Sequence, residues 1–182
     1  MRPTIYLDCD GVLADFEGAA TRLLGLPPLE FQARHGLKEF WRRLHRAPGF
    51  YAGLPELPDA RELYDGVRRL DPVILTGCPR GGWAEAQKER WAAEHFPDAP
   101  IITCMAVDKR RYARPGDVLI DDTLKYRDLW EDAGGVFIHH LDARRSLQAL
   151  RRIHPELFQE TGPRGPADRP CPSPSAQPSP AP

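Results

Sequence analysis

Short apolar runs alternate with longer amphipathic segments along most of this chain. The apolar runs predict β-strands, because they are rich in Val, Ile and Leu and end at acids or turn residues. They cover residues 4–8, 72–76, 100–104, 117–121 and 135–139. The amphipathic segments between them predict helices over residues 12–24, 59–70, 82–95 and 123–133, and a further helix from Ala143. Since this alternation is typical of βαβ units, we expect an α/β fold with a Rossmann-like parallel sheet flanked by helices.

Two stretches depart from the alternation. Residues 26–57 contain paired prolines and an amphipathic run from Leu37 to Leu44, which predict a small helical insertion after the first strand and helix. Residues 162–182 are rich in Pro and Ser and almost lack apolar side chains, so they cannot bury enough surface to offset the entropy of ordering. We therefore expect one domain over residues 1–161 and a disordered tail over residues 162–182.

Composition narrows the possible functions. The 182 residues include 25 basic and 26 acidic side chains, a balance that argues against a protein that coats nucleic acid. No apolar run approaches the roughly 18–20 residues that cross a bilayer, and the first residues enter a strand without a secretion signal. The four cysteines show neither paired metal spacing nor disulfide-rich density. We expect a cytoplasmic protein with reduced thiols and with no membrane or nucleic-acid polymer as a partner.

Polar side chains follow the predicted strands at the points where the strands end. In a parallel sheet these points share one edge, where α/β proteins bind their ligands. The side chains at this edge are Asp8, Asp10, Thr76, Lys109, Asp121 and Asp122. A carboxylate that directly follows a buried strand is costly unless a cation neutralises it. Several such carboxylates together form the oxygen-rich site that Mg²⁺ prefers.

These residue types match the requirements of phosphoryl transfer. Asp8 would attack phosphorus as a nucleophile, and Asp10, two residues later, would protonate the leaving oxygen and then activate water. The Thr76 hydroxyl and the Lys109 ammonium would donate hydrogen bonds to the phosphoryl oxygens. The pattern therefore predicts a Mg²⁺-dependent phosphate-monoester hydrolase that works through an aspartyl-phosphate intermediate.

Four segments resemble, in order, the motifs of the haloacid dehalogenase-like (HAD) phosphatase superfamily. Asp8-Cys9-Asp10-Gly11-Val12 is similar to the first motif, and Ile74-Leu75-Thr76-Gly77 is similar to the second. Lys109 stands in the place of the third motif, and Leu119-Ile120-Asp121-Asp122 is similar to the metal-binding fourth. The resemblance implies a HAD-like fold, with Mg²⁺ held by Asp8, the carbonyl of Asp10 and an acid of the 121–122 pair. Dehalogenases of the superfamily lack the second Asp of the first motif, so Asp10 indicates phosphoryl transfer.

Within that superfamily the chain looks most like the 5′(3′)-deoxyribonucleotidase group. The run from Asp8 to Phe16 and the segment of residues 48–58 carry this similarity. The resemblance implies a small helical cap over roughly residues 17–57 and a nucleoside monophosphate as the substrate. It also implies an aromatic substrate pocket, formed by Phe16, Phe40 and Trp41.

The chain departs from the nucleotidases at the second motif. They have Thr-Ser-Pro there, whereas this chain has Thr76-Gly77-Cys78, so at Gly77 only the backbone N–H would serve the phosphate. The direct metal ligand is open as well. The nucleotidase resemblance implies Asp122, whereas the wider superfamily often uses the first acid, here Asp121.

Three functions stay open at this point. The first is a phosphatase for nucleoside monophosphates. The second is a phosphatase for another small metabolite, such as a sugar phosphate. Independently of the substrate, Phe40 and Trp41 could simply pack the cap onto the core. The third is a catalytically silent HAD-like domain that binds a partner. The complete set of acids argues against this third function. The oligomeric state is also open.

Overall fold

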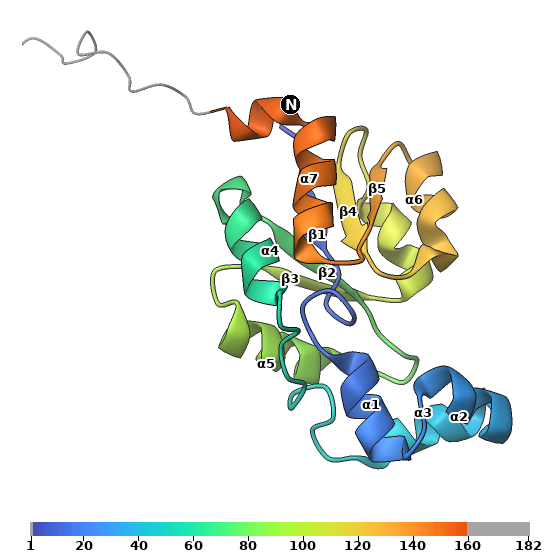
Figure 1. Cartoon of the computed structure of the whole chain (residues 1–182). Coiled ribbons are helices and arrows are strands. Elements are labelled where there is room, and N and C mark those ends of the chain that lie inside the picture. The colour runs from blue at the N-terminus through green and yellow to red at the C-terminus, as the bar shows by residue number, and fades with distance from the viewer. Residues whose placement is uncertain (1, 160–182) are drawn as a thin grey trace, which may run out of the picture.

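The protein forms a parallel sheet of five strands in the order β3-β2-β1-β4-β5 (Figure 1). The computed structural model describes residues 2–159, so the predicted tail of residues 162–182 lies outside the described residues. The strands are β1 (Ile5–Leu7), β2 (Val73–Gly77), β3 (Ile101–Cys104), β4 (Val118–Asp121) and β5 (Val136–His139). This topology confirms the α/β fold that the alternating pattern predicts.

The first strand lies at the centre of the sheet. Leu7 at the end of β1 pairs with Ile74 on one side and with Ile120 on the other, so the chain winds outward from β1 in both directions. Ligands of open α/β sheets bind where the winding direction changes, beyond the carboxyl ends of the strands. The residues that follow β1, β2 and β4 are therefore brought to the same edge.

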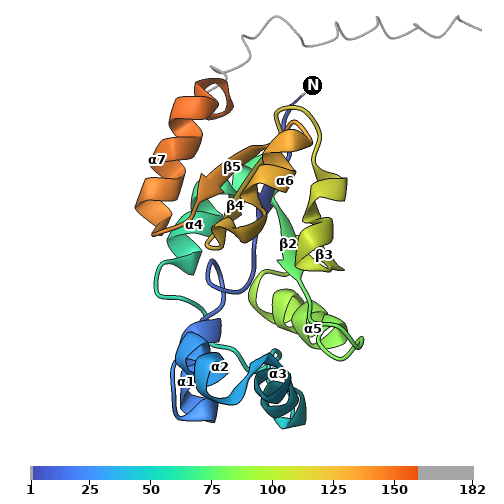
Figure 2. The same cartoon turned by 90° about the vertical axis from the view of Figure 1, so that its right-hand side faces the viewer.

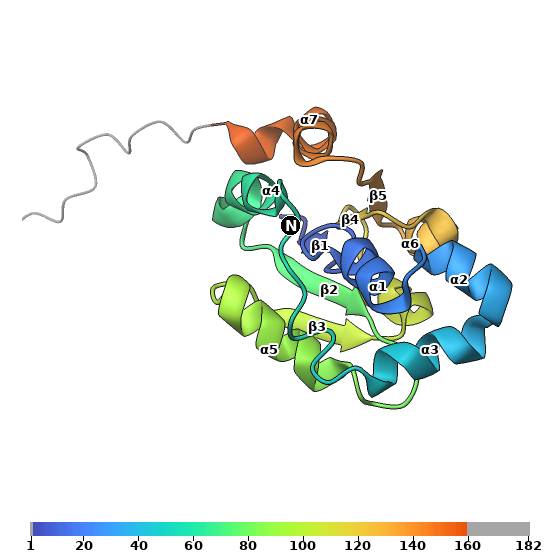
Figure 3. The same ribbon diagram turned by 60° about the horizontal axis from the view of Figure 1, so that its bottom comes forward.

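Helices cover both faces of the sheet, as Figure 3 shows. The helices that follow the strands are α4 (Ala60–Val67), α5 (Glu85–His95), α6 (Arg127–Asp132) and α7 (Ala143–Ile153). Ile5 and Leu7 share one buried cluster with side chains of α4, α5 and α7, whereas Tyr6 between them packs with Trp130 of α6 on the opposite face. This alternation follows from the two-residue period of a strand. No helix among residues 2–159 is long and apolar enough to cross a bilayer.

The segment expected to form the cap, roughly residues 17–57, contains three helices that lie beyond the carboxyl ends of the strands (Figure 2). These helices are α1 (Phe16–Leu24), α2 (Pro28–His35) and α3 (Leu37–Arg46). The chain leaves the sheet and returns to it through two segments that pair with each other. Leu57 donates its N–H to the Leu13 carbonyl at 2.9 Å, and Asp15 donates its N–H to the Pro55 carbonyl at 2.8 Å. These paired connections fix where the three helices stand above the sheet edge.

The first helix begins later than the sequence pattern predicts. The pattern predicts a start at residue 12, but residues 11–14 form a tight turn in which Leu13 and Ala14 both donate to the Cys9 carbonyl at 2.8 Å. Val12 and Leu13 fit the apolar pattern of a helix, but they are buried as part of this turn. The helix starts only after Asp15, whose side chain accepts the N–H of Gly18 as an N-cap.

Three other boundaries differ from the prediction. The helix predicted from residue 82 begins at Glu85, because Gly81 and Gly82 have positive φ values of 112° and 68°. The helix predicted over residues 123–133 is divided into a 3₁₀ turn, Leu124–Tyr126, and α6. The basic segment after β3, for which no helix is predicted, is a 3₁₀ helix over Ala106–Tyr112.

The contact between α4 and α7 gives a test of the packing. A Cβ on Gly66 would lie 2.6 Å and 2.7 Å from the two Cδ atoms of Leu147, which is buried. We expect Gly66→Val to lower the free energy of unfolding by about 1–3 kcal/mol, because the new side chain overpacks this contact. Urea denaturation measures the change. Asp65→Val, which introduces the same β-branched residue at an exposed position of α4, is expected to change it by about 0.5 kcal/mol or less. Equal effects of the two substitutions would contradict this packing argument.

Candidate functional site

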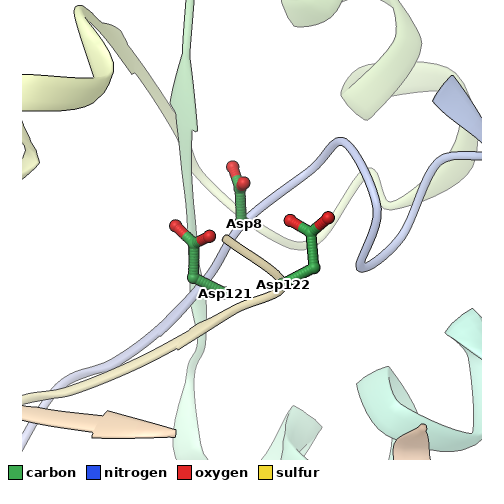
Figure 4. A group of neighbouring side chains, drawn as sticks. All are labelled: Asp8, Asp121 and Asp122. Carbon is green, nitrogen blue, oxygen red and sulfur yellow. The ribbon is translucent and has the colours of Figure 1, made fainter. Parts of the chain in front are cut away.

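Three carboxylates converge at the carboxyl edge of the sheet. Asp8 follows β1, Asp121 ends β4 and Asp122 follows it. Each offers one oxygen, and these three oxygens lie within 4.8 Å of one another (Figure 4). Asp8 and Asp121 are buried, and Asp122 lies at the exposed rim. The register of β1 with β4 creates this group, since Leu7 and Ile120 are paired and each directly precedes an acid.

Gly11 makes room for the third carboxylate. Its φ of +78° is in the left-handed region, and a Cβ there would come within 3.0 Å of the Asp122 carboxylate. A side chain at position 11 would therefore displace Asp122 from the cluster. Only glycine satisfies both the backbone conformation and the close approach.

Lys109 lies between two of the acids. Its Nζ is 2.8 Å from Asp8 Oδ1 and donates to Asp121 Oδ2 at 2.7 Å. Burial alone would lower the pKa of Lys109, but Asp8 and Asp121 outweigh it and hold the pKa above its ordinary value. The ammonium therefore stays charged and offsets part of the repulsion between the carboxylates.

The two adjacent acids have different hydrogen-bond partners. Asp121 uses both oxygens, because Oδ2 accepts from Lys109 and Oδ1 accepts the N–H of Thr123 at 2.8 Å. Within residues 2–159, the Asp122 carboxylate accepts only a long bond of 3.4 Å, from the Thr123 hydroxyl. Asp122 is therefore the acid of the pair with more freedom to coordinate a cation.

The crowding of the carboxylates shifts their pKa values. Burial raises the pKa of Asp121, and the nearby Asp8 adds to the rise. Desolvation within the cluster, followed by the charges of Asp8 and Asp121, raises the pKa of Asp122 to about 7, although part of its surface stays exposed. A divalent cation would relieve this repulsion. Three carboxylate oxygens within 4.8 Å of one another are a donor set of the kind that Mg²⁺ prefers.

A second cluster joins Asp10 and Thr76 through a lysine that the sequence analysis did not identify. Lys88 of α5 is fully buried. Its Nζ donates to Asp10 Oδ2 at 2.7 Å, to Thr76 Oγ1 at 2.8 Å and to the Gly77 carbonyl at 2.8 Å. One signal was present in the sequence. Lys88 lies at helical spacing between Ala84 and Ala92 on the buried face of α5, where a lysine must have a partner.

Asp10 has one occupied and one free oxygen. Oδ2 accepts from Lys88, whereas Oδ1 is buried and has no hydrogen-bond partner among the described residues. Burial raises the pKa of Asp10, and the charge of Lys88 opposes that rise. A carboxyl group whose pKa is raised holds its proton to a higher pH than usual, which a general acid requires.

Gly77 has a structural reason to lack a side chain. A Cβ at this position would lie 2.9 Å from the Ala106 Cβ, at the start of the 3₁₀ helix that follows β3. A serine could be accommodated here only if Ala106 moved. The departure from the nucleotidase motif is therefore linked to the close packing of Ala106 against β2.

The three aromatic residues expected in a substrate pocket differ in exposure. Phe16 is partly exposed and lies 6.0 Å from Tyr51 between ring centroids, with the rings stacked. Phe40 is only 1% exposed and packs edge-to-face against the partly exposed Trp41, at 4.8 Å. In this arrangement the ring of Phe40 is enclosed by packing. The substrate-binding role of these residues remains a prediction.

Comparisons with known proteins agree with this geometry. No family model matches the chain. A Bordetella pertussis (strain Tohama I) protein, provisionally assigned as a 5′(3′)-deoxyribonucleotidase, is 31% identical over 137 residues, which cover 65% of this chain and 73% of that protein. The crystal structure of a HAD-superfamily hydrolase from Ehrlichia chaffeensis superposes with a TM-score of 0.52 at 11% identity, covering 84% of this chain and 98% of that chain. At this identity the structural likeness shows the fold.

The fit between Gly11 and Asp122 can be tested with a matched glycine. We expect Gly11→Ala to lower the free energy of unfolding by about 1–2 kcal/mol for the left-handed backbone, and also to weaken Mg²⁺ binding because its Cβ would displace the Asp122 carboxylate. Gly25 has a similar φ of +75°, but a Cβ on it would meet nothing within 4 Å, so Gly25→Ala should show only the loss of stability. Urea denaturation and calorimetry with Mg²⁺ measure the two effects. Unchanged Mg²⁺ binding in Gly11→Ala would show that Asp122 does not depend on this glycine.

Proposed function

This chain belongs to the haloacid dehalogenase-like hydrolase superfamily, and from that premise we propose that it hydrolyses phosphate monoesters through an aspartyl-phosphate intermediate. The single observation that supports this most is the placement of Asp8. Its Oδ1 is held by the Cys9 N–H at 2.8 Å and by Lys109 at 2.8 Å, and it lies beside the Asp121–Asp122 pair. A carboxylate oriented in this way is suited to nucleophilic attack.

In the proposed first step Asp8 forms a bond to phosphorus while the bond to the leaving alcohol oxygen breaks. Asp10 gives its proton to that oxygen, so the alcohol leaves neutral. In the second step water attacks phosphorus, its proton returns to Asp10, and the bond to Asp8 breaks. Inorganic phosphate leaves, and both carboxyl groups regain their starting states.

The phosphoryl oxygens need donors in both steps. Lys109 uses two of its three hydrogens on Asp8 and Asp121, which leaves one for the substrate. The Thr76 hydroxyl and the Gly77 N–H are the further donors proposed here. Such donors stabilise the charge that spreads over the oxygens in the transition state.

Mg²⁺ is the proposed cofactor, held by Asp8, the Asp10 carbonyl and Asp122, with Asp121 as the alternative acid. The free oxygens of Asp122 favour it over Asp121, both of whose oxygens are already hydrogen-bonded. When bound, Mg²⁺ would reduce the repulsion between the anionic substrate and the acidic cluster.

The proposed substrate is a nucleoside monophosphate, in the cytoplasm. The support is the similarity to the Bordetella protein together with the partly exposed rings of Phe16 and Trp41. We propose that α1–α3, within the cap of roughly residues 17–57, cover the nucleoside, and that the domain extends over residues 1–161.

The absence of a side chain at Gly77 favours a second candidate, another small phosphorylated metabolite such as a sugar phosphate, because one specific contact to the substrate is missing.

The nucleophile assignment can be tested with an aryl phosphate. Asp8→Asn is expected to lower Mg²⁺-dependent release of phosphate from para-nitrophenyl phosphate by at least about 10³-fold, because the amide cannot form the acyl phosphate. Asp142→Asn should retain wild-type rates, because it removes a surface carboxylate but keeps an N-cap for α7. A panel of nucleotides and sugar phosphates, with and without Mg²⁺, then identifies the substrate class. Undiminished turnover by Asp8→Asn would refute the mechanism, and a flat response to every deoxynucleotide would refute the nucleotide substrate.

The shifted pKa of Asp122 predicts how Mg²⁺ binding depends on pH. Below pH 7 this carboxyl is protonated in the metal-free protein and must release its proton to bind a cation. Mg²⁺ affinity measured by calorimetry should therefore be about tenfold higher at pH 8 than at pH 6. In Asp122→Asn this pH dependence should disappear. An affinity that does not vary between pH 6 and pH 8 in the wild type would contradict the assignment.

The same shift affects the stability of the metal-free protein. Because the folded pKa of Asp122 lies above the ordinary value of 3.8, the folded state binds the proton more tightly than the unfolded state does. The contribution of this group to stability is therefore fully present below about pH 4 and is lost as the pH rises through about 7.

A further inference from the structure

Lys88 is a buried charged residue that the proposed chemistry does not use, although all three hydrogens of its ammonium group are hydrogen-bonded. It lies on α5, and none of its surface is exposed. Its three ammonium hydrogens match three acceptors at 2.7–2.8 Å: the Asp10 carboxylate, the Thr76 hydroxyl and the Gly77 carbonyl. The ring of Tyr51 also lies 4.7 Å from Nζ. An ammonium with every hydrogen used cannot itself contact a substrate.

The bond to Thr76 determines the direction of the threonine hydroxyl. An ammonium group has no lone pair, so in this pair Lys88 is the donor and Thr76 is the acceptor. The single hydroxyl hydrogen of Thr76 must then point away from Lys88. Thr76 is fully buried, so water does not compete for that hydrogen. The lysine therefore turns an adaptable hydroxyl into a donor with one direction.

The bond to Asp10 acts in the same way on the carboxylate. Lys88 binds Oδ2, and the buried Oδ1 is the oxygen that has no partner among the described residues. With one oxygen held by Lys88, the carboxyl plane of Asp10 is fixed. One buried cation thus sets the orientation of two groups from different strands of the sheet edge.

The surroundings of Lys88 keep its position fixed. On the same helix, Gln87 Oε1 accepts the Tyr51 N–H at 3.0 Å, and Trp91 Nε1 donates to the Leu54 carbonyl at 2.7 Å. Tyr51 and Leu54 belong to the segment that returns from α3 to the sheet. Helix α5 therefore holds the insertion and the two oriented groups at once.

We propose that Lys88 is a positioning residue for phosphoryl transfer, which acts by directing the Thr76 hydroxyl hydrogen toward the phosphoryl group and by fixing the plane of the Asp10 carboxyl group. This inference rests on the proposed phosphatase function. It differs from a purely structural role, in which Lys88 would stabilise the fold without orienting either group.

A double-mutant cycle separates these two roles. Lys88→Met keeps the length of the side chain without the ammonium, and Thr76→Val keeps the shape without the hydroxyl. With Mg²⁺ and para-nitrophenyl phosphate, each single variant should lose about 10²-fold in kcat, with a smaller change in KM, because an oriented donor acts mainly in the transition state. If Lys88 acts through Thr76, the kcat of the double variant should lie within about threefold of the kcat of the less active single variant. The proposal would be overturned if the fold-loss in kcat of the double variant equalled the product of the two single losses. A wild-type kcat in Lys88→Met would overturn it as well.

A second variant and a second measurement guard against misfolding and against failure of the phosphatase assignment. Lys88→Gln retains N–H donors, so it should recover part of the kcat lost in Lys88→Met, and it replaces Met in the cycle if that variant does not fold. Calorimetry with orthovanadate and Mg²⁺ needs no turnover, because vanadate mimics the five-coordinate phosphorus of the transition state. Weaker vanadate binding in Lys88→Met and Thr76→Val, with no greater weakening in the double variant, would support the positioning role even if the wild type hydrolysed none of the phosphates tested. Unchanged vanadate binding in Lys88→Met would overturn it.

Discussion

The arrangement of the site depends on charge balance at one edge of a parallel sheet. Buried carboxylates repel one another and lose hydration, so they persist only where cations compensate them. Lys109 compensates Asp8 and Asp121, and Lys88 compensates Asp10. Because the two lysines come from different crossover segments, the acids and their cations assemble only when the whole sheet has formed.

The proposed division of labour between the two lysines follows from how many hydrogens each has left. Lys109 has one hydrogen that neither Asp8 nor Asp121 accepts, so it would remain available to a phosphoryl oxygen. Lys88 has none, and it would work by orienting its neighbours. Two side chains of the same type thus have different chemical roles because their surroundings differ.

Close backbone approaches shape the same edge. Gly11 admits the Asp122 carboxylate, and Gly77 admits Ala106. The first approach completes the acidic cluster, whereas the second removes a side chain that the nucleotidase resemblance would place near the phosphate. Under the proposed function, the substrate class would therefore depend more on α1–α3 and on the aromatic rings than on the second motif.

The sequence by itself determined the sheet, because each strand is a continuous apolar run whose identity does not depend on distant residues. It also indicated which acids would gather, since residues that end parallel strands share an edge. The helix starts predicted at residues 12 and 82 are too early, because a tight turn and two glycines with positive φ override the apolar pattern. Only the tertiary structure revealed the contacts of Lys88, since its partners lie on β2 and after β1 and no local pattern specifies how the buried face of α5 is rotated toward them. Hydrogen-bond geometry between distant segments is a property of the assembled core, and this is the part of the site that the chain specifies only through its fold.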